Sequence, residues 1–268
     1  PDGSRVQVKC LRLLGKYILA RNIIVTGCTD HAVFAKGQYI IAEKLEVYHN
    51  DKRPTGGNWP SALKGEIGAQ NIVFRDNVVY ENYGEGMDCT MTIGCWGYRN
   101  YLRDNWSMGI YADNSENVHF WGNHITNTGN PTYSRFLQNG VRTNGCGLIG
   151  AENYTSYGWT TNRIKDIYFR DNYFENCRPI SVWNPVGATL VNVNVQDNSF
   201  YNTFGGTVNV PNANVSGNVL LSSPPTPTPG GTLTTPSLVP SVTPSKTPTK
   251  TVTPSPTIIP TKTSTPVV

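Results

Sequence analysis

One short pattern recurs along this chain, and it limits the possible folds more than any other feature of the sequence. The segment NIVFRDNVVYEN at residues 71–82 nearly returns as DIYFRDNYFEN at residues 166–176. The same skeleton of alternating apolar residues, a turn that ends in Asn and a second short apolar run recurs at residues 101–110, 118–127, 193–202 and 214–221. Self-similarity at periods in the twenties predicts a solenoid, in which each repeat is one turn of the chain.

Within each repeat the apolar residues alternate, which indicates strands. In residues 71–77, Ile72 and Phe74 fall on one face, and Val73 and Arg75 fall on the other. Strands this short, separated by Asn, Gly and Asp, stack most simply as a parallel β-helix. Each strand then pairs with its copy about 4.8 Å further along the axis. The sequence therefore predicts an all-β fold.

The residue at each turn has a structural role in such a stack. The turn positions align as Cys28, Leu45, Asn77, Asn105, Asn123, Asn172, Asn198 and Asn218. An Asn tolerates the left-handed backbone of a tight bend, and its amide can bond the copies above and below. We expect the six aligned Asn side chains to form a ladder. Taken singly, each of them would be an ordinary surface turn.

These repeats resemble the right-handed parallel β-helix superfamily typified by pectate lyase, in particular bacterial extracellular proteins with β-helix repeats. The resemblance is carried by NIVFRDNVVYENYGEGMD (71–88), YLRDNWSMGIYADNSENVHFWGN (101–123) and IKDIYFRDNYFENC (164–177), and it covers nearly all of residues 20–222. It implies a right-handed parallel β-helix in a bacterial protein that is secreted or held at the cell surface. The superfamily contains lyases, hydrolases, epimerases and noncatalytic surface proteins, so the resemblance leaves the activity open.

The last part of the chain differs in composition. Twelve of the nineteen prolines lie in residues 223–268, with no acidic and no aromatic residue. Such a segment buries too little apolar surface to offset its ordering entropy, so we expect a disordered Thr/Pro/Ser-rich linker or stalk suited to O-glycosylation outside the cell. Residues 1–222 would then form one β-helix domain. The chain opens on PDGSRVQ without a signal peptide, as expected of a fragment or a processed piece.

Charge and hydropathy argue against two classes of partner. Nineteen of the 22 basic residues and all 18 acidic residues precede residue 223, so this part has a net charge of only about +1. The sequence has no stripe of basic residues of the kind that binds along a phosphate backbone, so nucleic acid is not expected as a partner. No apolar run reaches membrane-spanning length. We expect a monomer whose partner is a polysaccharide.

The six cysteines do not have the spacing of a metal finger. Their even number allows disulfides, with Cys89 and Cys95 as the closest pair. We favour the alternative that all six are small buried residues stacked inside the solenoid.

One column of outward-facing residues is the candidate site. The strands that contain it align as SALKG (61–65), EGMDC (85–89), MGIYAD (108–113), NGVRTN (139–144), ISVWN (180–184) and GTVNV (206–210). The apolar residues expected to point inward are Leu63, Met87, Ile110 and Val141. The next residues point outward: Lys64, Asp88, Tyr111 and Arg142. Two positions further along are Asp113, Asn144 and Trp183, about one strand spacing apart.

Charges of both signs beside Tyr and Trp suit an acidic sugar. Aromatic rings stack on a sugar, and Lys or Arg pairs with its carboxylate. The candidate substrate-binding residues are Tyr111, Asp113, Asn144, Trp183, Arg53 and Trp59. The last two lie in the long insertion 47–65, and a second insertion at 126–140 carries further aromatic and basic residues. Long loops of this kind commonly form the wall of a cleft.

Lyase chemistry, which the resemblance implies, needs a cation to neutralise the uronate carboxylate and a base to remove the neighbouring proton. The candidate catalytic residues are Lys64, Arg142 and Asp88, with Lys64 or Arg142 as the base. The candidate ligands for a Ca²⁺ ion are Glu85, Asp88 and Asp113. The sequence has no calcium-binding or base-containing signature of a characterised lyase, and no paired-Asp signature of a polygalacturonase-like hydrolase.

Two functional hypotheses follow. The first is an extracellular carbohydrate-active protein, most simply a polysaccharide lyase-like enzyme acting on a uronate-containing polymer. The second is a noncatalytic β-helix that binds carbohydrate or adheres at the cell surface, held away from the cell by residues 223–268. In the second, the column is a solvated face whose alternating charges prevent lateral aggregation.

Overall fold

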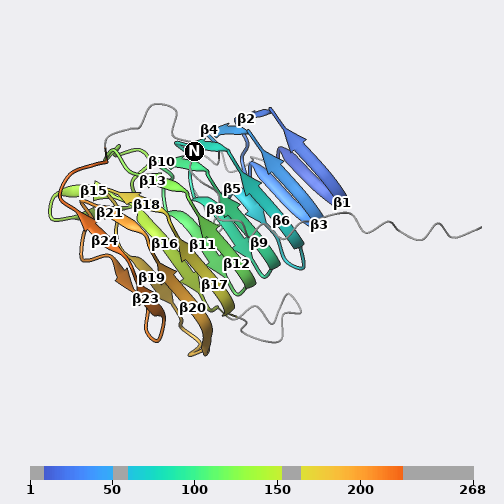
Figure 1. Ribbon diagram of the computed structural model, residues 1–268. Coiled ribbons are helices and arrows are strands. Elements are labelled where there is room, and N and C mark those ends of the chain that lie inside the picture. Colours follow the sequence, from blue (N-terminus) through green and yellow to red (C-terminus); the bar gives the residue numbers. More distant parts are fainter. Residues whose placement is uncertain (1–8, 51–59, 153–163, 226–268) are drawn as a thin grey trace, which may run out of the picture. The chain divides into compact units, whose positions relative to one another are not determined.

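The computed structural model describes residues 9–50, 60–152 and 164–225, and within these ranges all regular structure is β-strand (Figure 1). The chain divides into two units, residues 1–233 and 234–268, and every described residue lies in the first. Most of the predicted linker 223–268 is therefore outside the described residues. In the part of the chain that the structure describes, no helix is long and apolar enough to cross a membrane.

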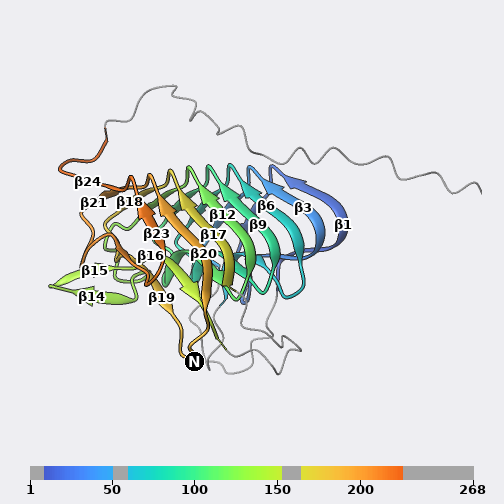
Figure 2. The same ribbon diagram turned by 60° about the horizontal axis from the view of Figure 1, so that its bottom comes forward.

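The chain visits three rows of strands in a repeating order, and each strand pairs in parallel with the strand of the same row one visit later. Row A contains β5 (Ser61–Gly65), β8 (Glu85–Thr90), β11 (Met108–Asp113), β16 (Gly145–Gly150), β19 (Ile180–Trp183) and β22 (Val208–Asn209). Row B contains β6 (Gln70–Arg75), β9 (Ile93–Tyr98), β12 (Glu116–Trp121), β17 (Ile164–Arg170), β20 (Leu190–Gln196) and β23 (Asn214–Ser216). Figure 2 shows the row B strands side by side in chain order.

Row C forms a separate sheet of eight strands. It contains β2 (Ile24–Thr26), β4 (Glu46–Tyr48), β7 (Val78–Tyr80), β10 (Tyr101–Arg103), β13 (His124–Thr126), β18 (Tyr173–Glu175), β21 (Ser199–Tyr201) and β24 (Val219–Leu221). Two long strands, β1 (Leu11–Arg21) and β3 (Val33–Glu43), join rows A and B into one sheet, because β3 pairs with both β5 and β6. The antiparallel hairpin of β14 (Phe136–Gln138) and β15 (Val141–Thr143) stands apart. The predicted all-β, parallel arrangement is confirmed.

Inward-facing side chains form columns across the strands. In row B, one column places Phe74, Gly97, Phe120 and Phe169 in register. The three Phe side chains are fully buried. Gly97 is required there, because a Cβ at this position would lie 2.4 Å from Cε of Met87. Burying one such Phe side chain contributes about 1.5–3 kcal/mol, so the repeated apolar positions account for the stacking.

The Asn ladder exists, with one member corrected. Each side-chain amide donates to the Oδ1 of the next at 2.9–3.0 Å, through Asn77, Asn100, Asn123, Asn172, Asn198 and Asn218. Asn100, not Asn105, follows Asn77. Asn105 belongs to a second ladder at the other end of row C, with Asn50 and Asn82. Row C strands are only three residues long, so the Asn before such a strand and the Asn after it lie five residues apart. The alignment of the repeats therefore assigned Asn105 to the first ladder in place of Asn100.

Cys28 also belongs to the second ladder, because its amide donates to Asn50 Oδ1 at 3.0 Å. The left-handed conformation was predicted for the ladder Asn itself, and this is wrong. It is the preceding residue that has positive φ, 56° at Asp76 and 54° at Asp171. The ladder Asn is therefore selected for its hydrogen bonds and not for its backbone tolerance.

All six cysteines form disulfides, so the expectation of free buried cysteines is wrong. The pairs are Cys10–Cys28, Cys89–Cys95 and Cys146–Cys177. Cys89 lies on row A and Cys95 on row B, and both are fully buried. The two rows face the same core, so cysteines that stack inside it also meet across it. The closest pair in the sequence is indeed bonded.

Candidate functional site

The outer side of row A holds the predicted column, and a local break in the alternation shapes it. In β8, Met87 is fully buried, and a Cβ on Gly86 would lie 2.7 Å from Cδ2 of the buried Leu102. Two consecutive positions therefore face the core. Glu85 and Asp88, on either side of them, share the outer side of the strand, while the register with β5 stays unbroken from Ser61–Glu85 to Lys64–Asp88.

Backbone register places the outer residues of row A in parallel columns. The first column runs through Ser61 and Glu85, then Met108, Gly145 and Arg178, where Met108 follows Glu85 if the register of Met87 with Ile110 continues two residues back. The second column runs through Phe34, Lys64, Asp88, Tyr111, Leu148, Ser181 and Asn209. The predicted neighbours Lys64, Asp88 and Tyr111 are thus adjacent in the structure.

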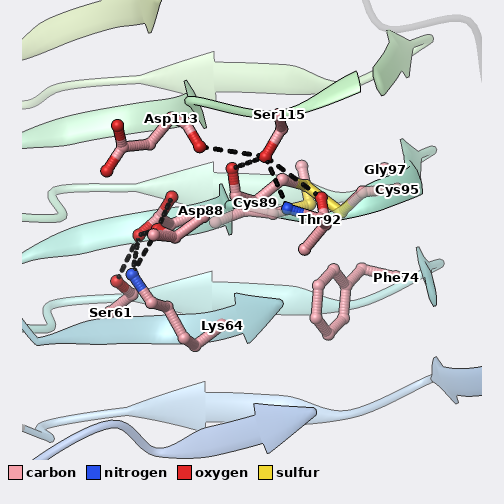
Figure 3. The surroundings of a disulfide bond; sticks show 12 residues. Ser61, Lys64, Phe74, Asp88, Cys89, Thr92, Cys95, Gly97, Asp113 and Ser115 are labelled. Atoms are coloured by element: carbon pink, nitrogen blue, oxygen red, sulfur yellow. Dashed lines mark hydrogen bonds and ion pairs between the residues drawn. A yellow bond between two sulfur atoms is a disulfide. The ribbon is translucent and has the colours of Figure 1, made fainter. Parts of the chain in front are cut away.

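A hydrogen-bonded network joins the two columns (Figure 3). The Lys64 ammonium forms an ion pair with the Asp88 carboxylate and also bonds the Thr90 hydroxyl. The Ser61 hydroxyl lies 3.2 Å from Glu85 Oε2 and 3.2 Å from Asp88 Oδ2. Glu85, Asp88 and Lys64 are only 5%, 2% and 7% exposed. The network is therefore almost completely screened from water, which strengthens its electrostatics.

The two carboxyl groups of this network have different roles. Burial, followed by the negative charge of Asp88, raises the pKa of Glu85 to about 8, against the opposing charge of Lys64. Glu85 therefore holds a proton at neutral pH while Asp88 pairs with Lys64. A protonated and an ionised carboxyl side by side are the arrangement that acid–base chemistry uses.

Lys64 stays charged. Burial by itself lowers the pKa of Lys64, but the combined attraction of Asp88, Glu66 and Asp113 outweighs it and raises that pKa above its ordinary value. An ammonium held in this way does not release its proton near neutral pH. This charge state does not suit the base role predicted for Lys64.

Three of the predicted binding residues lie on the outer side of row A, and two of them, Tyr111 and Asp113, are on the strand next to β8. The Tyr111 ring covers Gly150, where a Cβ would lie 2.2 Å from the Tyr111 hydroxyl oxygen. That hydroxyl lies 3.3 Å from a Glu152 carboxylate oxygen. Asp113 and Trp183 share a third outer column, both in register with Gly150. Trp183 is 55% exposed, whereas Tyr111 and Asp113 are buried.

The predicted fourth strand of the column is wrong. Residues 141–143 form β15 of the hairpin, where Arg142 pairs with Leu137. Val141, expected to point inward, is 44% exposed. Row A continues with β16 instead, and its Leu148 takes the outward position assigned to Arg142. The segment GCGLIG carries no charge, so it lacks the adjacent apolar and charged residues that mark β5 and β8.

Asn144 is also not part of the column. It is 1% exposed, and its Oδ1 accepts a hydrogen bond from the Arg135 amide at 2.8 Å. Its Nδ2 donates to the Tyr133 carbonyl at 2.6 Å and to Asn127 Oδ1 at 3.0 Å. Asn144 therefore joins separate parts of the loop 127–144 to one another, which is a structural role.

Two predicted binding residues, Arg53 and Trp59, lie outside the described residues. The predicted ligands for Ca²⁺ do not converge. The described residues form no group of three or more His, Cys, Asp and Glu side chains that could hold a metal ion. Glu85 and Asp88 are neighbours through Ser61, but Asp113 is in register with Thr90 and not with Asp88.

Sequence reasoning missed Ser61, Thr90 and Arg178 as members of this face. A signal for the first was present: a small residue precedes the inward apolar residue in both Ala62–Leu63 and Gly86–Met87. Two adjacent inward positions place the residue before them on the outer side. No sequence signal places Arg178 in the first column, because it joins only through a single bridge to Gly145.

Comparison with known proteins gives only a weak likeness. No protein-family model matches the chain, and no curated protein matches it. Two solved structures of DFA-IIIase from Arthrobacter chlorophenolicus A6 without its lid, one of them in complex with GF2, are similar at a TM-score of 0.31 and 14% identity. The likeness covers 75% of this chain, which spans about 50% of the length of those chains. At this TM-score it carries no weight for the function of this chain.

Proposed function

We propose that this protein is a right-handed parallel β-helix that acts on carbohydrate outside the cell, and that it cleaves glycosidic bonds by acid–base chemistry at Glu85 and Asp88. The observation that carries the proposal is that the carboxyl groups of Glu85 and Asp88 both lie within hydrogen-bonding distance of the Ser61 hydroxyl. Ser61 Oγ lies 3.2 Å from each, and the pKa of Glu85 is raised to about 8. Glycoside hydrolysis uses one protonated and one ionised carboxyl in this way.

The chemical step follows from these protonation states. Glu85 would donate its proton to the bridging oxygen as the C–O bond breaks and Asp88 bonds the anomeric carbon. A water molecule, deprotonated by Glu85, would then displace Asp88 from that carbon and restore both carboxyl groups. Two carboxyl oxygens at 3.2 Å from one hydroxyl lie less than twice that distance apart. Inverting enzymes keep roughly 6.5–9.5 Å between their carboxyl groups to admit a water, and retaining enzymes roughly 5–5.5 Å, so two carboxyl groups that share one hydroxyl favour retention of configuration.

Hydrolysis is favoured over the elimination implied by the family resemblance. Elimination needs an unprotonated base near the uronate, and the raised pKa of Lys64 keeps that side chain protonated. Arg142, the other candidate base, lies in the hairpin and not in row A. A Ca²⁺-assisted lyase reaction on a uronate polymer stays a prediction for which the described residues supply no converging ligands.

The disulfides support the proposed location outside the cell. Three disulfides use every cysteine of the chain, and such bonds persist in oxidising environments. Together with the Thr/Pro-rich residues 223–268, they support a secreted or surface location.

The second candidate is a noncatalytic carbohydrate-binding module. The observation in its favour is that Glu85 and Asp88 are only 5% and 2% exposed. Asp88 already has three partners, Ser61, Lys64 and Thr90, which is how a purely structural network is satisfied.

One experiment separates these candidates. The protein is incubated with neutral and acidic polysaccharides, and both new reducing ends and the ultraviolet absorbance of unsaturated products are followed. Hydrolysis predicts reducing ends without unsaturation, and a loss of about 10²–10⁴-fold in Glu85→Gln and in Asp88→Asn. The matched control is Asp171→Asn, since Asp171 is exposed at a row B turn. Unsaturated products would support the lyase instead, and binding without any product would support the module.

A further inference from the structure

A cavity of about 280 Å³ lies on the outer side of row A, beyond the carboxyl pair. It is lined by Met108 and Gly145 of the first column and by Phe136, Gln138, Arg178, Ser181, Phe204 and Asn209. The hairpin supplies Phe136 and Gln138, and row A strands supply Ser181 and Asn209. The cavity therefore combines aromatic surface, hydroxyl and amide groups and one cation, a composition suited to a sugar.

Arg178 is the charged group of this cavity. Among the described residues no carboxylate pairs with it, and its guanidinium carbon lies 4.3 Å from the Phe136 ring centroid. Its backbone is held on both sides, by a 2.9 Å bond to the Asn144 carbonyl and a 3.0 Å bond from the Cys146 amide. The disulfide of Cys146 to the adjacent Cys177 fixes the same point. A rigid cation without a counterion favours an anionic ligand group.

The cavity and the carboxyl pair lie on one continuous face. Glu85 and Arg178 belong to the first outer column, separated by Met108 and Gly145. Three strand steps of about 4.8 Å put roughly 14 Å between them along the row, a length that a short oligosaccharide spans.

We propose that this cavity is a subsite for a negatively charged sugar, and that Arg178 pairs with its carboxylate or sulfate. Phe136 holds the Arg178 guanidinium against its ring, Phe204 packs against the sugar, and Gln138, Ser181 and Asn209 bond its hydroxyl groups. This inference rests on the proposed carbohydrate role and adds the substrate class. It does not require that Glu85 and Asp88 be catalytic.

The methionines give a readout that is independent of activity. The chain has three, and only Met108 lines the cavity, whereas Met87 and Met91 are 0% and 1% exposed in the core. The protein is labelled with ¹³C at the methionine methyl groups and titrated with galacturonate, galactose 6-sulfate, galactose and acetate. The Met108 signal is expected to shift with one or both charged sugars and to move much less with galactose or acetate. The signals of Met87 and Met91 should stay in place and report an intact core.

Two variants complete the test. Arg178→Gln should abolish the shift caused by charged sugars, while Arg170→Gln, on the outer side of row B, should leave it unchanged. Comparison of galacturonate with the sulfate ester identifies which anion is accepted. No Met108 shift with either charged sugar overturns the proposal, even if a polysaccharide is cleaved. An equal shift with acetate overturns the sugar part. A shift without any cleavage keeps this subsite and rejects the hydrolase.

Discussion

The outer sides of rows A and B differ although the two rows enclose one core. On row A, the outer groups are buried polar side chains that bond one another: Lys64, Asp88 and Glu85 are at most 7% exposed. On row B, the equivalent outer column carries rings in register. The His119 ring stacks on Trp96 at 6.4 Å and on Tyr168 at 4.4 Å between centroids. These rings are partly exposed.

This difference shows which positions the repeat constrains. The inward columns of both rows must fill the same narrow space, so they are apolar throughout. The outward columns have no such restriction. In the column of Trp96, His119 and Tyr168, row B uses them for ring stacking, which buries no charge. Row A uses them for buried ionisable groups, which are costly to bury and are therefore the better sign of a functional site.

The largest expected effect comes from removing the cation of row A. Lys64→Met leaves the Asp88 carboxylate buried without its counterion, so we expect the free energy of unfolding to fall by about 3–5 kcal/mol, measured by denaturant unfolding. The matched control on row B is Lys165→Met, whose side chain is 55% exposed, and it should stay within about 0.5 kcal/mol. Equal effects of the two substitutions would show that the outer sides of the rows do not differ in this respect.

A second expected effect concerns pH. The pKa of Glu85 is raised to about 8 in the folded protein, above that of an exposed Glu, so the folded state binds the proton more tightly. Glu85 therefore makes the protein less stable as pH rises from about 4.5 to about 8, by at most about 1.4 kcal/mol per pH unit.

The variant Glu85→Gln keeps the neutral form at every pH, so it should lose much less stability over that window. Denaturant unfolding at several pH values measures this slope. The groups that interact electrostatically with Glu85, namely Asp88, Lys64 and Arg135, are unchanged in the variant. A slope equal to that of the wild type would mean that Glu85 titrates normally.

The smallest expected effect is on row B. Burial, and then the charge of Arg170, lowers the pKa of His119 to about 4. Removing the stacked ring in Tyr168→Ala exposes the imidazole, so its pKa should rise toward the ordinary value, with about 0.5–1.5 kcal/mol of lost ring stacking. NMR titration of the imidazole measures it.

His31 beside row A is the internal reference for that titration. Its pKa is lowered to about 2 by burial and by Lys64 and Lys9, so Tyr168→Ala should leave it unchanged. If His31 moved as well, the two outer sides would not be independent.

Much of the architecture could be predicted because it depends on local spacing. Period-two alternation defines the strands, and the recurring Asn defines where they turn, so parallel stacking and the Asn ladder follow from the sequence. Lys64, Asp88 and Tyr111 were placed side by side correctly, because their strands are separated by short connections of similar length. The prediction of this outer column failed only around residues 127–150, where an insertion with its own hairpin precedes β16.

The sequence by itself determined that the strands stack in parallel and that certain side chains repeat along them, because both depend on neighbours a few residues apart. Only the tertiary structure decided that Glu85 and Asp88 share one hydroxyl, that all cysteines pair, and that Arg178 lies in the column of Glu85. These features join residues through the core or across insertions of variable length. The protonation of Glu85 depends on the burial that results, and no local pattern encodes that burial.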